Sequence, residues 1–244
     1  MTYFPYISNP QRIPGVILSR DAGLINFYQL SKTRIKYVLL NLGTGLEEDL
    51  TLKTYLRETR QYQIKVVGFY FKSRAASVED AIQEAKMVKK VIKNIVGNTY
   101  RVNKMIVFAW TAETMEALEA EGKMVSKPYI GHIAEAFTNE IEKGDYRVFL
   151  AIEHSWMGKV SEMNPYRTHR KWNVSTLDAQ VHSKSIDYLE FGKGPMNGIE
   201  KDVPYFVKRR KKKTEELSLT DPKGKKLTTE ASISDESLLE PCQE

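Results

Sequence analysis

The chain has little that would stabilise it covalently or hold it in a membrane. Its single cysteine, Cys242, lies near the C-terminus, so no intrachain disulfide can form. No stretch approaches the roughly 18 consecutive apolar residues that a membrane span requires. The N-terminal segment MTYFPYISNPQRIPG has neither the basic nor the apolar region of a secretory signal. We therefore expect a chain made in the cytoplasm, without a signal peptide and without a membrane span.

Patterns that hold a metal or a nucleotide are also missing. The four histidines show neither the H-x₃-H nor the H-E-x-x-H spacing of zinc sites; they are His132, His154, His169 and His182. The segment Gly43-Thr44-Gly45 lacks the rest of a P-loop or dinucleotide-binding motif, and we interpret it as a turn. We therefore expect no metal and no cofactor.

Charge is plentiful but unevenly spread. The 37 Lys and Arg residues outnumber the 31 Asp and Glu residues, and an excess of this sign attracts polyanions such as nucleic acid, teichoic acids or a membrane surface. The one dense basic cluster consists of Lys208, Arg209, Arg210, Lys211, Lys212 and Lys213. It is interpreted either as a solvated basic tail or as a site that docks an anionic polymer or a partner protein.

The composition changes at Val207. Residues 207–244 are rich in Lys, Glu, Ser and Thr and contain few large apolar side chains, so they cannot bury enough surface to offset chain entropy. We expect this segment to be a disordered or partner-docking tail that binds other virion or host-surface proteins. Little else in the sequence favours nucleic acid as the partner.

Residues 1–206 alternate between strand-like and helix-like patterns. A hydrophobic fraction of 41% and a charged fraction of 28% are ordinary for a globular protein, and the length suits one large domain. Runs typical of strands span residues 16–18, 35–42, 64–71, 105–110, 146–152, 172–176 and 186–191. Because several of these runs are apolar on both faces, they resemble the buried strands of a parallel sheet.

Amphipathic helices are predicted between these runs. In residues 77–96, Ser77 is placed as the N-cap, Asp80 completes a capping box and Gly97 ends the helix. Similar patterns span residues 50–62, 112–121 and 129–143. Strands and helices that alternate at this spacing predict right-handed crossovers and a parallel sheet, either open or closed.

Five segments resemble the glycoside hydrolase family 25 lysozymes in order and spacing. From Gly15, GVILSRDAGLINFYQL resembles the opening strand of that family, which reads G-I-D-x-S, and the helix after it. The following segments are similar to later strands and helices; they read IKYVLLNLGTG, QIKVVGFYFKSRAASVEDAIQEA, HIAEAFTNEIEKGDYRVFLAIEHSWM and IDYLEFGKGPMNGIEKDVPYF. The resemblance covers residues 13–206 and implies a TIM-like (β/α) barrel.

The resemblance also implies a function. Members of the family are muramidases of bacteria and bacteriophages that cut the polysaccharide of peptidoglycan, with the site at the carboxyl ends of the barrel strands. Glycoside hydrolysis needs one protonated carboxyl group and a second carboxylate. The first family acid corresponds here to Ile17, which can neither carry charge nor exchange protons.

Few acids remain to take the family roles. The family's central D-x-E pair corresponds to Thr111 and Glu113 in one register, and in a second register neither acid is present. Glu113 is thus the candidate general acid, or simply a glutamate of a first helical turn. Asp202 matches the terminal family aspartate, or is a loop aspartate bonded to nearby backbone. An acid displaced to Asp21 is a weaker alternative.

Two aromatic residues at strand ends are candidates for stacking on sugar rings. Tyr70 and Trp110 are the best placed, and the alternative for both is packing in the core.

Because most family carboxylates are absent, the sequence favours a non-catalytic module. It would be a structural or cell-wall-recognising part of a bacterium or a phage virion, binding peptidoglycan or a related wall glycan. The first alternative is an active, divergent muramidase that uses Glu113 and Asp202. The second is nucleic-acid binding through the basic tail.

Overall fold

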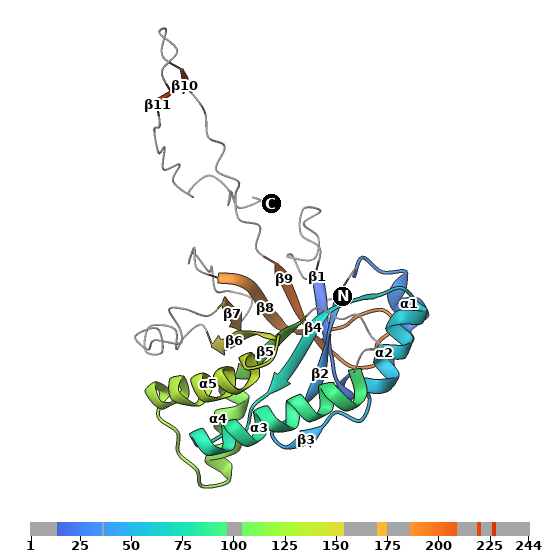
Figure 1. The fold of residues 1–244 in the computed structure, drawn as a ribbon. Coiled ribbons are helices and arrows are strands. Elements are labelled where there is room, and N and C mark those ends of the chain that lie inside the picture. Colours follow the sequence, from blue (N-terminus) through green and yellow to red (C-terminus); the bar gives the residue numbers. More distant parts are fainter. Residues whose placement is uncertain are drawn as a thin grey trace, which may run out of the picture. The chain divides into compact units, whose positions relative to one another are not determined.

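The computed structural model describes residues 14–35, 37–96, 104–153, 170–174 and 186–208, and two short strands in the C-terminal region (Figure 1). The chain divides into two compact units, Met1–Arg209 and Arg210–Glu244, which are described separately. In the second unit, β10 (Leu219–Thr220) pairs antiparallel with β11 (Lys226–Leu227). The first unit contains the other helices and strands of the described residues.

Nine strands of the first unit form one sheet. Their bounds are β1 Pro14–Leu18, β2 Tyr37–Thr44, β3 Glu47–Glu48, β4 Lys65–Lys72, β5 Met105–Trp110, β6 Arg147–Glu153, β7 Arg170–Val174, β8 Ile186–Gly194 and β9 Val203–Lys208. They pair in the order β1-β9-β8-β7-β6-β5-β4-β2-β3, and β1 also pairs with β2. The order therefore returns to its start, and all the strands except β3 form a ring.

The ring is parallel apart from one strand. Neighbours from β1 through β2, β4, β5, β6 and β7 to β8 run parallel. The last strand, β9, is antiparallel to both β8 and β1. Chain reversal at β9 therefore brings residues just before this strand to the carboxyl ends of the others.

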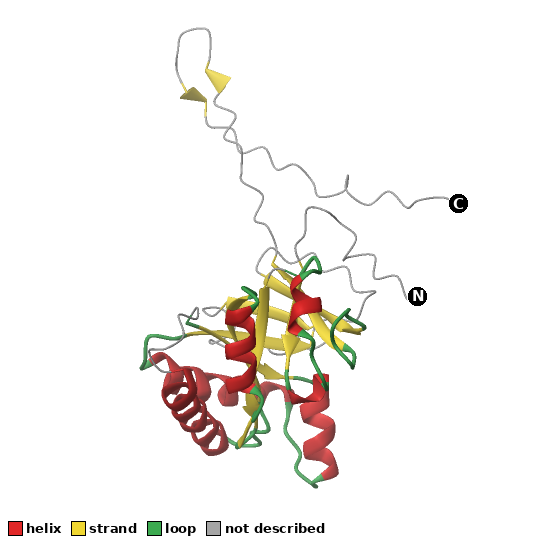
Figure 2. Ribbon diagram, turned by 90° about the vertical axis from the view of Figure 1, so that its right-hand side faces the viewer, coloured by secondary structure: helices red, strands yellow, loops and turns green. Residues whose placement is uncertain are grey.

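The described helices lie outside the ring and pack against β2, β4, β5 and β6 (Figure 2). Their bounds are α1 Phe27–Ser31, α2 Leu52–Gln61, α3 Val78–Val91, α4 Ala112–Ala120 and α5 Lys127–Glu142, with the 3₁₀ turn η1 Arg20–Ala22 and the π-helical turn η2 Ile92–Val96. At the start of α3, the Ser77 side chain accepts from the Asp80 backbone, and the Asp80 side chain accepts from the Ser77 N–H. This capping box confirms the one predicted from the sequence.

Two hydrophobic clusters lie on the two faces of the ring. The outer cluster joins strand residues such as Phe71 and Phe108 to helix residues such as Phe137 of α5, whose ring centroid lies 4.5 Å from that of Phe108. The interior cluster contains strand residues only; they are Ile17, Leu39, Tyr70, Met105, Val107, Ala109, Phe149, Ala151 and Phe206. Alternate residues of one strand therefore belong to different clusters, as a barrel requires.

The predicted β/α barrel-like arrangement is confirmed, with small differences at its edges. The short strand β3 was not expected, and it arises because the chain turns back after Thr44 to pair with β2. The segment that begins at Val203 also forms a strand. Because β9 runs on to Lys208, the expected start of the tail at Val207 falls inside this strand.

Candidate functional site

The candidate site lies at the end of the ring where the parallel strands finish, called the mouth below. Arg20 and Asp21 follow β1 there, and Glu113 lies in the first turn of α4, shortly after β5. Val203 of β9 pairs with Gly194 at the end of β8, so Asp202 is at the mouth as well. The fold therefore brings the predicted acids Glu113 and Asp202 to one end of the barrel.

Ile17 lies inside the ring. It is 4% exposed and belongs to the interior cluster, whereas its neighbours Val16 and Leu18 belong to the outer cluster. The position that corresponds to the first acid of the lysozyme pattern is thus an apolar side chain packed among other apolar side chains. Ile17 offers no group for proton transfer.

Glu113 forms an ion pair with a lysine of the neighbouring strand end. Its carboxylate lies 3.3 Å from Lys72 Nζ, and its side chain is 64% exposed. Partial burial acts to raise the pKa of Glu113, but Lys72, Lys193 and Arg74 together outweigh this effect and hold the pKa below its usual value. A general acid needs the opposite shift, because it must carry a proton near neutral pH.

Asp202 is exposed and precedes β9. Burial, and to a lesser extent the charge of Asp202, raises the pKa of Tyr205 to about 12. The Tyr205 hydroxyl donates to the backbone oxygen of Pro195. Asp21, the weaker candidate, is near Ser19, whose hydroxyl lies 3.5 Å from its carboxylate.

Tyr70 is buried in the interior and bonds to an acid that the sequence did not single out. The residue is 4% exposed, and its hydroxyl donates to Glu190 Oε2 on β8 at 3.2 Å. Glu190 is 7% exposed. A carboxylate within an otherwise apolar strand segment, LEF, was the signal available in the sequence. Tyr70 and Glu190 form a polar pair within the barrel, and the Tyr70 ring shows almost no surface to a ligand.

Trp110 packs in the core, which is the alternative that the sequence left open for it. The residue is 0% exposed and belongs to the outer cluster, between the sheet and the helices. Its indole N–H donates to the backbone oxygen of Ala75 at 3.0 Å. No face of the ring is left on which a sugar could stack.

The loop after β4 is anchored by a buried glutamate of α3. Glu84 is 2% exposed, and its two carboxylate oxygens accept from the Ser73 hydroxyl at 2.6 Å and the Arg74 N–H at 2.7 Å. Burial raises the pKa of Glu84 to about 7, against the lowering effect of these two hydrogen bonds. The Thr114 hydroxyl also donates to the Ser73 oxygen at 2.9 Å. The loop that follows Lys72 and presents Arg74 at the mouth is thus fixed.

Asp49 joins the loops that follow β1 and β2. It is 2% exposed, and one carboxylate oxygen accepts from the Arg20 N–H at 2.9 Å and from Asn41 Nδ2 at 3.2 Å. The other accepts from the Thr51 N–H at 3.0 Å and from the Thr51 hydroxyl at 2.6 Å. This carboxylate is fully engaged in holding the rim of the mouth.

The remaining expectations concern ions, membranes and the basic cluster. In the part of the chain that the structure describes, no group of three or more His, Cys, Asp or Glu side chains could hold a metal ion. None of the described helices is long and apolar enough to cross a membrane. Of the basic run Lys208–Lys213, Lys208 is the last residue of β9, and the other five lie outside the described residues.

Comparisons with known proteins identify the fold. No protein-family model and no curated protein matches the chain. Among solved structures, the modular autolysin LytC of Streptococcus pneumoniae is 17% identical with a TM-score of 0.66, over 80% of this chain and 46% of that one. The spore cortex lytic enzyme SleM of Clostridium perfringens is 15% identical with a TM-score of 0.68, over 83% and 68% of the two chains.

A family 25 glycosyl hydrolase of Bacillus anthracis is 17% identical with a TM-score of 0.62, over 82% of this chain and 90% of that one. The chain thus spans about half the length of the pneumococcal autolysin and most of the Bacillus enzyme. At these identities the likeness shows a fold, which is that of the family 25 lysozymes. It confirms the fold that the sequence resemblance predicted.

Proposed function

We propose that this chain is a non-catalytic cell-wall module that recognises peptidoglycan glycan through a lysozyme-like barrel, as part of a bacterium or a phage virion. The solved structures with the same fold include an autolysin, a spore cortex lytic enzyme and a family 25 glycosyl hydrolase, which supports a role at the cell wall. The observation that carries the absence of catalysis is the position of Ile17, an apolar residue packed in the barrel interior.

The charge state of Glu113, the candidate general acid, also supports the absence of catalysis. Cleavage needs a protonated carboxyl group beside the leaving oxygen and a second carboxylate near the anomeric carbon. Glu113 has a lowered pKa because cations surround it, so it is ionised near neutral pH. Loss of either group removes several kcal/mol of transition-state stabilisation, or about three orders of magnitude in rate.

An active, divergent peptidoglycan hydrolase is the second candidate. It is supported by the position of Glu113 and Asp202 at the same end of the barrel and by the buried Glu190 inside it. In this alternative, Glu113 and Asp202 form the catalytic pair, and Glu190 is a further acid to be tested. Each of these residues has a close isostere, so the alternative can be tested one residue at a time.

Binding and cleavage can be measured on one material, sacculi stripped of their anionic polymers. We expect the full chain to co-sediment with these sacculi and to release no reducing sugar ends. The variants Glu113→Gln, Asp202→Asn and Glu190→Gln should co-sediment equally. Absence of co-sedimentation would overturn glycan recognition. Release of reducing ends that one of these variants abolishes would establish the hydrolase instead.

A further inference from the structure

The end of the ring opposite the mouth, called the base below, gathers exposed cations. Lys65 begins β4, Lys104 directly precedes β5, and Arg147 begins β6. Arg34 lies in the segment between α1 and β2, three positions before the first residue of β2. All four residues are exposed. Since the strands are parallel, these residues share one end of the barrel.

Backbone pairing fixes how these residues lie along the base. The Arg147 N–H donates to the Lys104 backbone oxygen at 2.8 Å, which places the two residues on adjacent strands. Lys65 is the register partner of Tyr37, the first residue of β2. The cations therefore follow the edge of the ring along β2, β4, β5 and β6, rather than clustering in one loop.

Among the described residues at this end, two acids already have partners. Asp145 forms an ion pair with Lys104, and Glu142 accepts from the Val148 N–H at 3.2 Å. Lysines at helix C-termini, such as Lys90 and Lys93, are favoured by the helix dipole and need no other explanation. The dipole does not explain Lys65 and Arg147, which begin strands, or Lys104, which directly precedes one.

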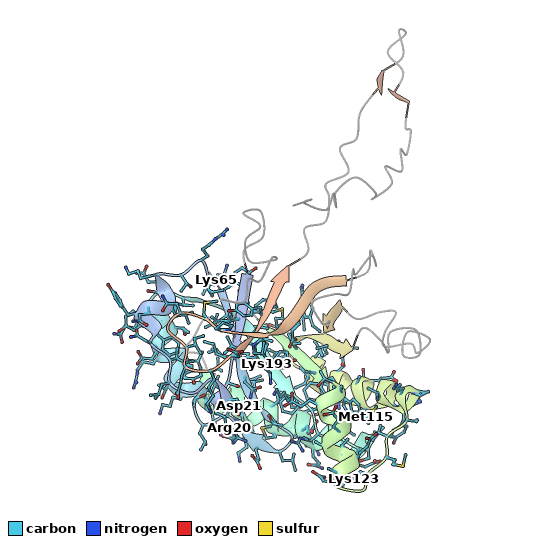
Figure 3. All side chains as sticks on the ribbon, turned by 180° about the vertical axis from the view of Figure 1, so that it is seen from behind. Arg20, Asp21, Lys65, Met115, Lys123 and Lys193 are labelled. Atoms are coloured by element: carbon cyan, nitrogen blue, oxygen red, sulfur yellow. The ribbon has the colours of Figure 1, made fainter. Side chains whose placement is uncertain are left out.

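Among the described residues, the mouth has the opposite balance of charge. The acids in or beside strand ends there are Asp21, Glu47, Glu48, Asp49, Glu113, Glu200 and Asp202, and the bases are Arg20, Lys72, Arg74, Lys193 and Lys201. Figure 3 shows Lys65 at one end of the strands and Arg20 and Asp21 at the other. The net positive charge of the chain is therefore not a property of the candidate site, and the base contributes to it.

The strand β9 leads the chain to the same end. It runs from Val203 at the mouth to Lys208, the register partner of Tyr188 near the start of β8. In the sequence, the residues after Lys208 are Arg209, Arg210, Lys211, Lys212 and Lys213. In the sequence, the densest run of cations in the chain thus directly follows the last residue of this strand.

From this placement we propose that the base binds a phosphodiester-linked anionic polymer of the bacterial cell wall, of the teichoic-acid kind, through Arg34, Lys65 and Arg147. The inference rests on the proposed function, because it requires both ends of the barrel to bind components of the cell wall: glycan at the mouth and an anionic polymer at the base. A chain of closely spaced phosphates engages several cations at once and releases its counterions, which gives an affinity that falls steeply with salt. Nucleic acids and anionic membranes also present negatively charged phosphates, and the test distinguishes them from the cell-wall polymer.

The test compares two triple variants with the same change in charge. The base variant carries Arg34→Glu, Lys65→Glu and Arg147→Glu. The control carries Lys53→Glu, Lys86→Glu and Lys201→Glu, three exposed lysines on α2, on α3 and near the mouth. Binding of the full chain to labelled poly(glycerol phosphate) is measured against salt, and the melting temperature of each variant reports folding.

We expect the base variant to lose about tenfold or more in affinity and to reduce the logarithmic salt slope by about 3, with the control close to wild type. Two further probes are a DNA duplex of equal phosphate count and phosphatidylglycerol vesicles. Equal losses in the two variants, or no binding of the polymer by wild type, would overturn the proposal. Tighter binding of DNA or vesicles than of the polymer would also overturn it.

The result of this test can be distinguished from the result of the test of the proposed function. Co-sedimentation with stripped sacculi tests glycan recognition and does not involve phosphates. A protein that binds stripped sacculi but not the polymer contradicts the inference alone. One that binds the polymer but not stripped sacculi contradicts the proposed function alone.

Discussion

The Tyr70 hydroxyl on β4 and the Glu190 carboxylate on β8 meet inside the barrel, with an Oη–Oε2 distance of 3.2 Å. Four steps around the ring separate these strands in either direction, so they lie on opposite sides of it. The hydrogen bond therefore spans the interior. It links the half of the barrel that the helices cover to the half that β9 closes.

Removal of this bond should cost stability. Tyr70→Phe keeps the ring but takes one donor from a carboxylate that is 7% exposed, and we expect a loss of about 1–2 kcal/mol in the free energy of unfolding. Urea unfolding monitored by circular dichroism measures it. Tyr28→Phe, at a ring that is 56% exposed, is the control and should stay within about 0.5 kcal/mol of wild type. Equal stability of the two variants would rule out an energetic role for the pair.

Glu84 should make stability depend on pH between about 4.5 and 7. Burial raises its pKa in the folded chain to about 7, so the folded state holds a proton in this window that the unfolded state has released. The contribution of Glu84 to the free energy of unfolding is therefore largest at low pH. It falls as pH rises through this window, by up to about 3 kcal/mol. Urea unfolding at several pH values should show that Glu84→Gln removes this fall. A curve of unchanged slope in the variant would assign it to other groups.

Gly198 should tolerate alanine less well than Gly122, although both have positive φ. At Gly198, with φ of +90°, an added Cβ would lie 2.8 Å from the Asn26 oxygen and 2.8 Å from the Leu30 nitrogen. At Gly122, with φ of +74°, nothing lies within 4 Å. Gly122→Ala should therefore cost only backbone strain of about 1 kcal/mol, and Gly198→Ala about 1–2 kcal/mol more. Thermal unfolding compares them, and similar melting temperatures would contradict the close approach of the α1 backbone.

Lys72 should control the ionisation of Glu113. Cations hold the Glu113 pKa below its usual value, with Lys72 the strongest of them, so Lys72→Met should raise this pKa. A carbon-13 NMR titration of the Glu113 carboxyl group measures the change. Lys53→Met, on α2, is the control and should leave the titration unchanged. If Lys72→Met also leaves it unchanged, the ion pair at the mouth does not form in solution.

Strands of the fold were predictable because their sequences are apolar on both faces, but this same property hid which way each residue points. Residues 105–110 read MIVFAW, and all six are buried. Val107 and Ala109 face the interior, whereas Phe108 and Trp110 face the helices. With no polar residue to mark either face, the sequence could not show that Trp110 turns away from the mouth.

The sequence predicted interactions between neighbouring residues more reliably than contacts between residues far apart in the chain. The capping box of Ser77 and Asp80 involves residues three apart, and it was predicted correctly. The Tyr70–Glu190 bond joins residues 120 positions apart, and its partner acid was not recognised. The flanking Leu189 and Phe191 marked Glu190 as unusual, but its pairing with Tyr70 follows only from the closure of β8 against β9 on the far side of the ring. The candidate acids at the mouth came instead from the family resemblance, which places them in register but says nothing of Lys72.

The four hydrogen bonds that Asp49 accepts have a consequence for how a ligand is received. They couple the turn after β1 to the start of α2 through one buried carboxylate, so neither segment can shift without breaking bonds of the other. That side of the rim is preorganised, and association there proceeds without the entropy cost of ordering a loop. On the function proposed above, a glycan that does not fit this contour is rejected rather than accommodated by induced fit.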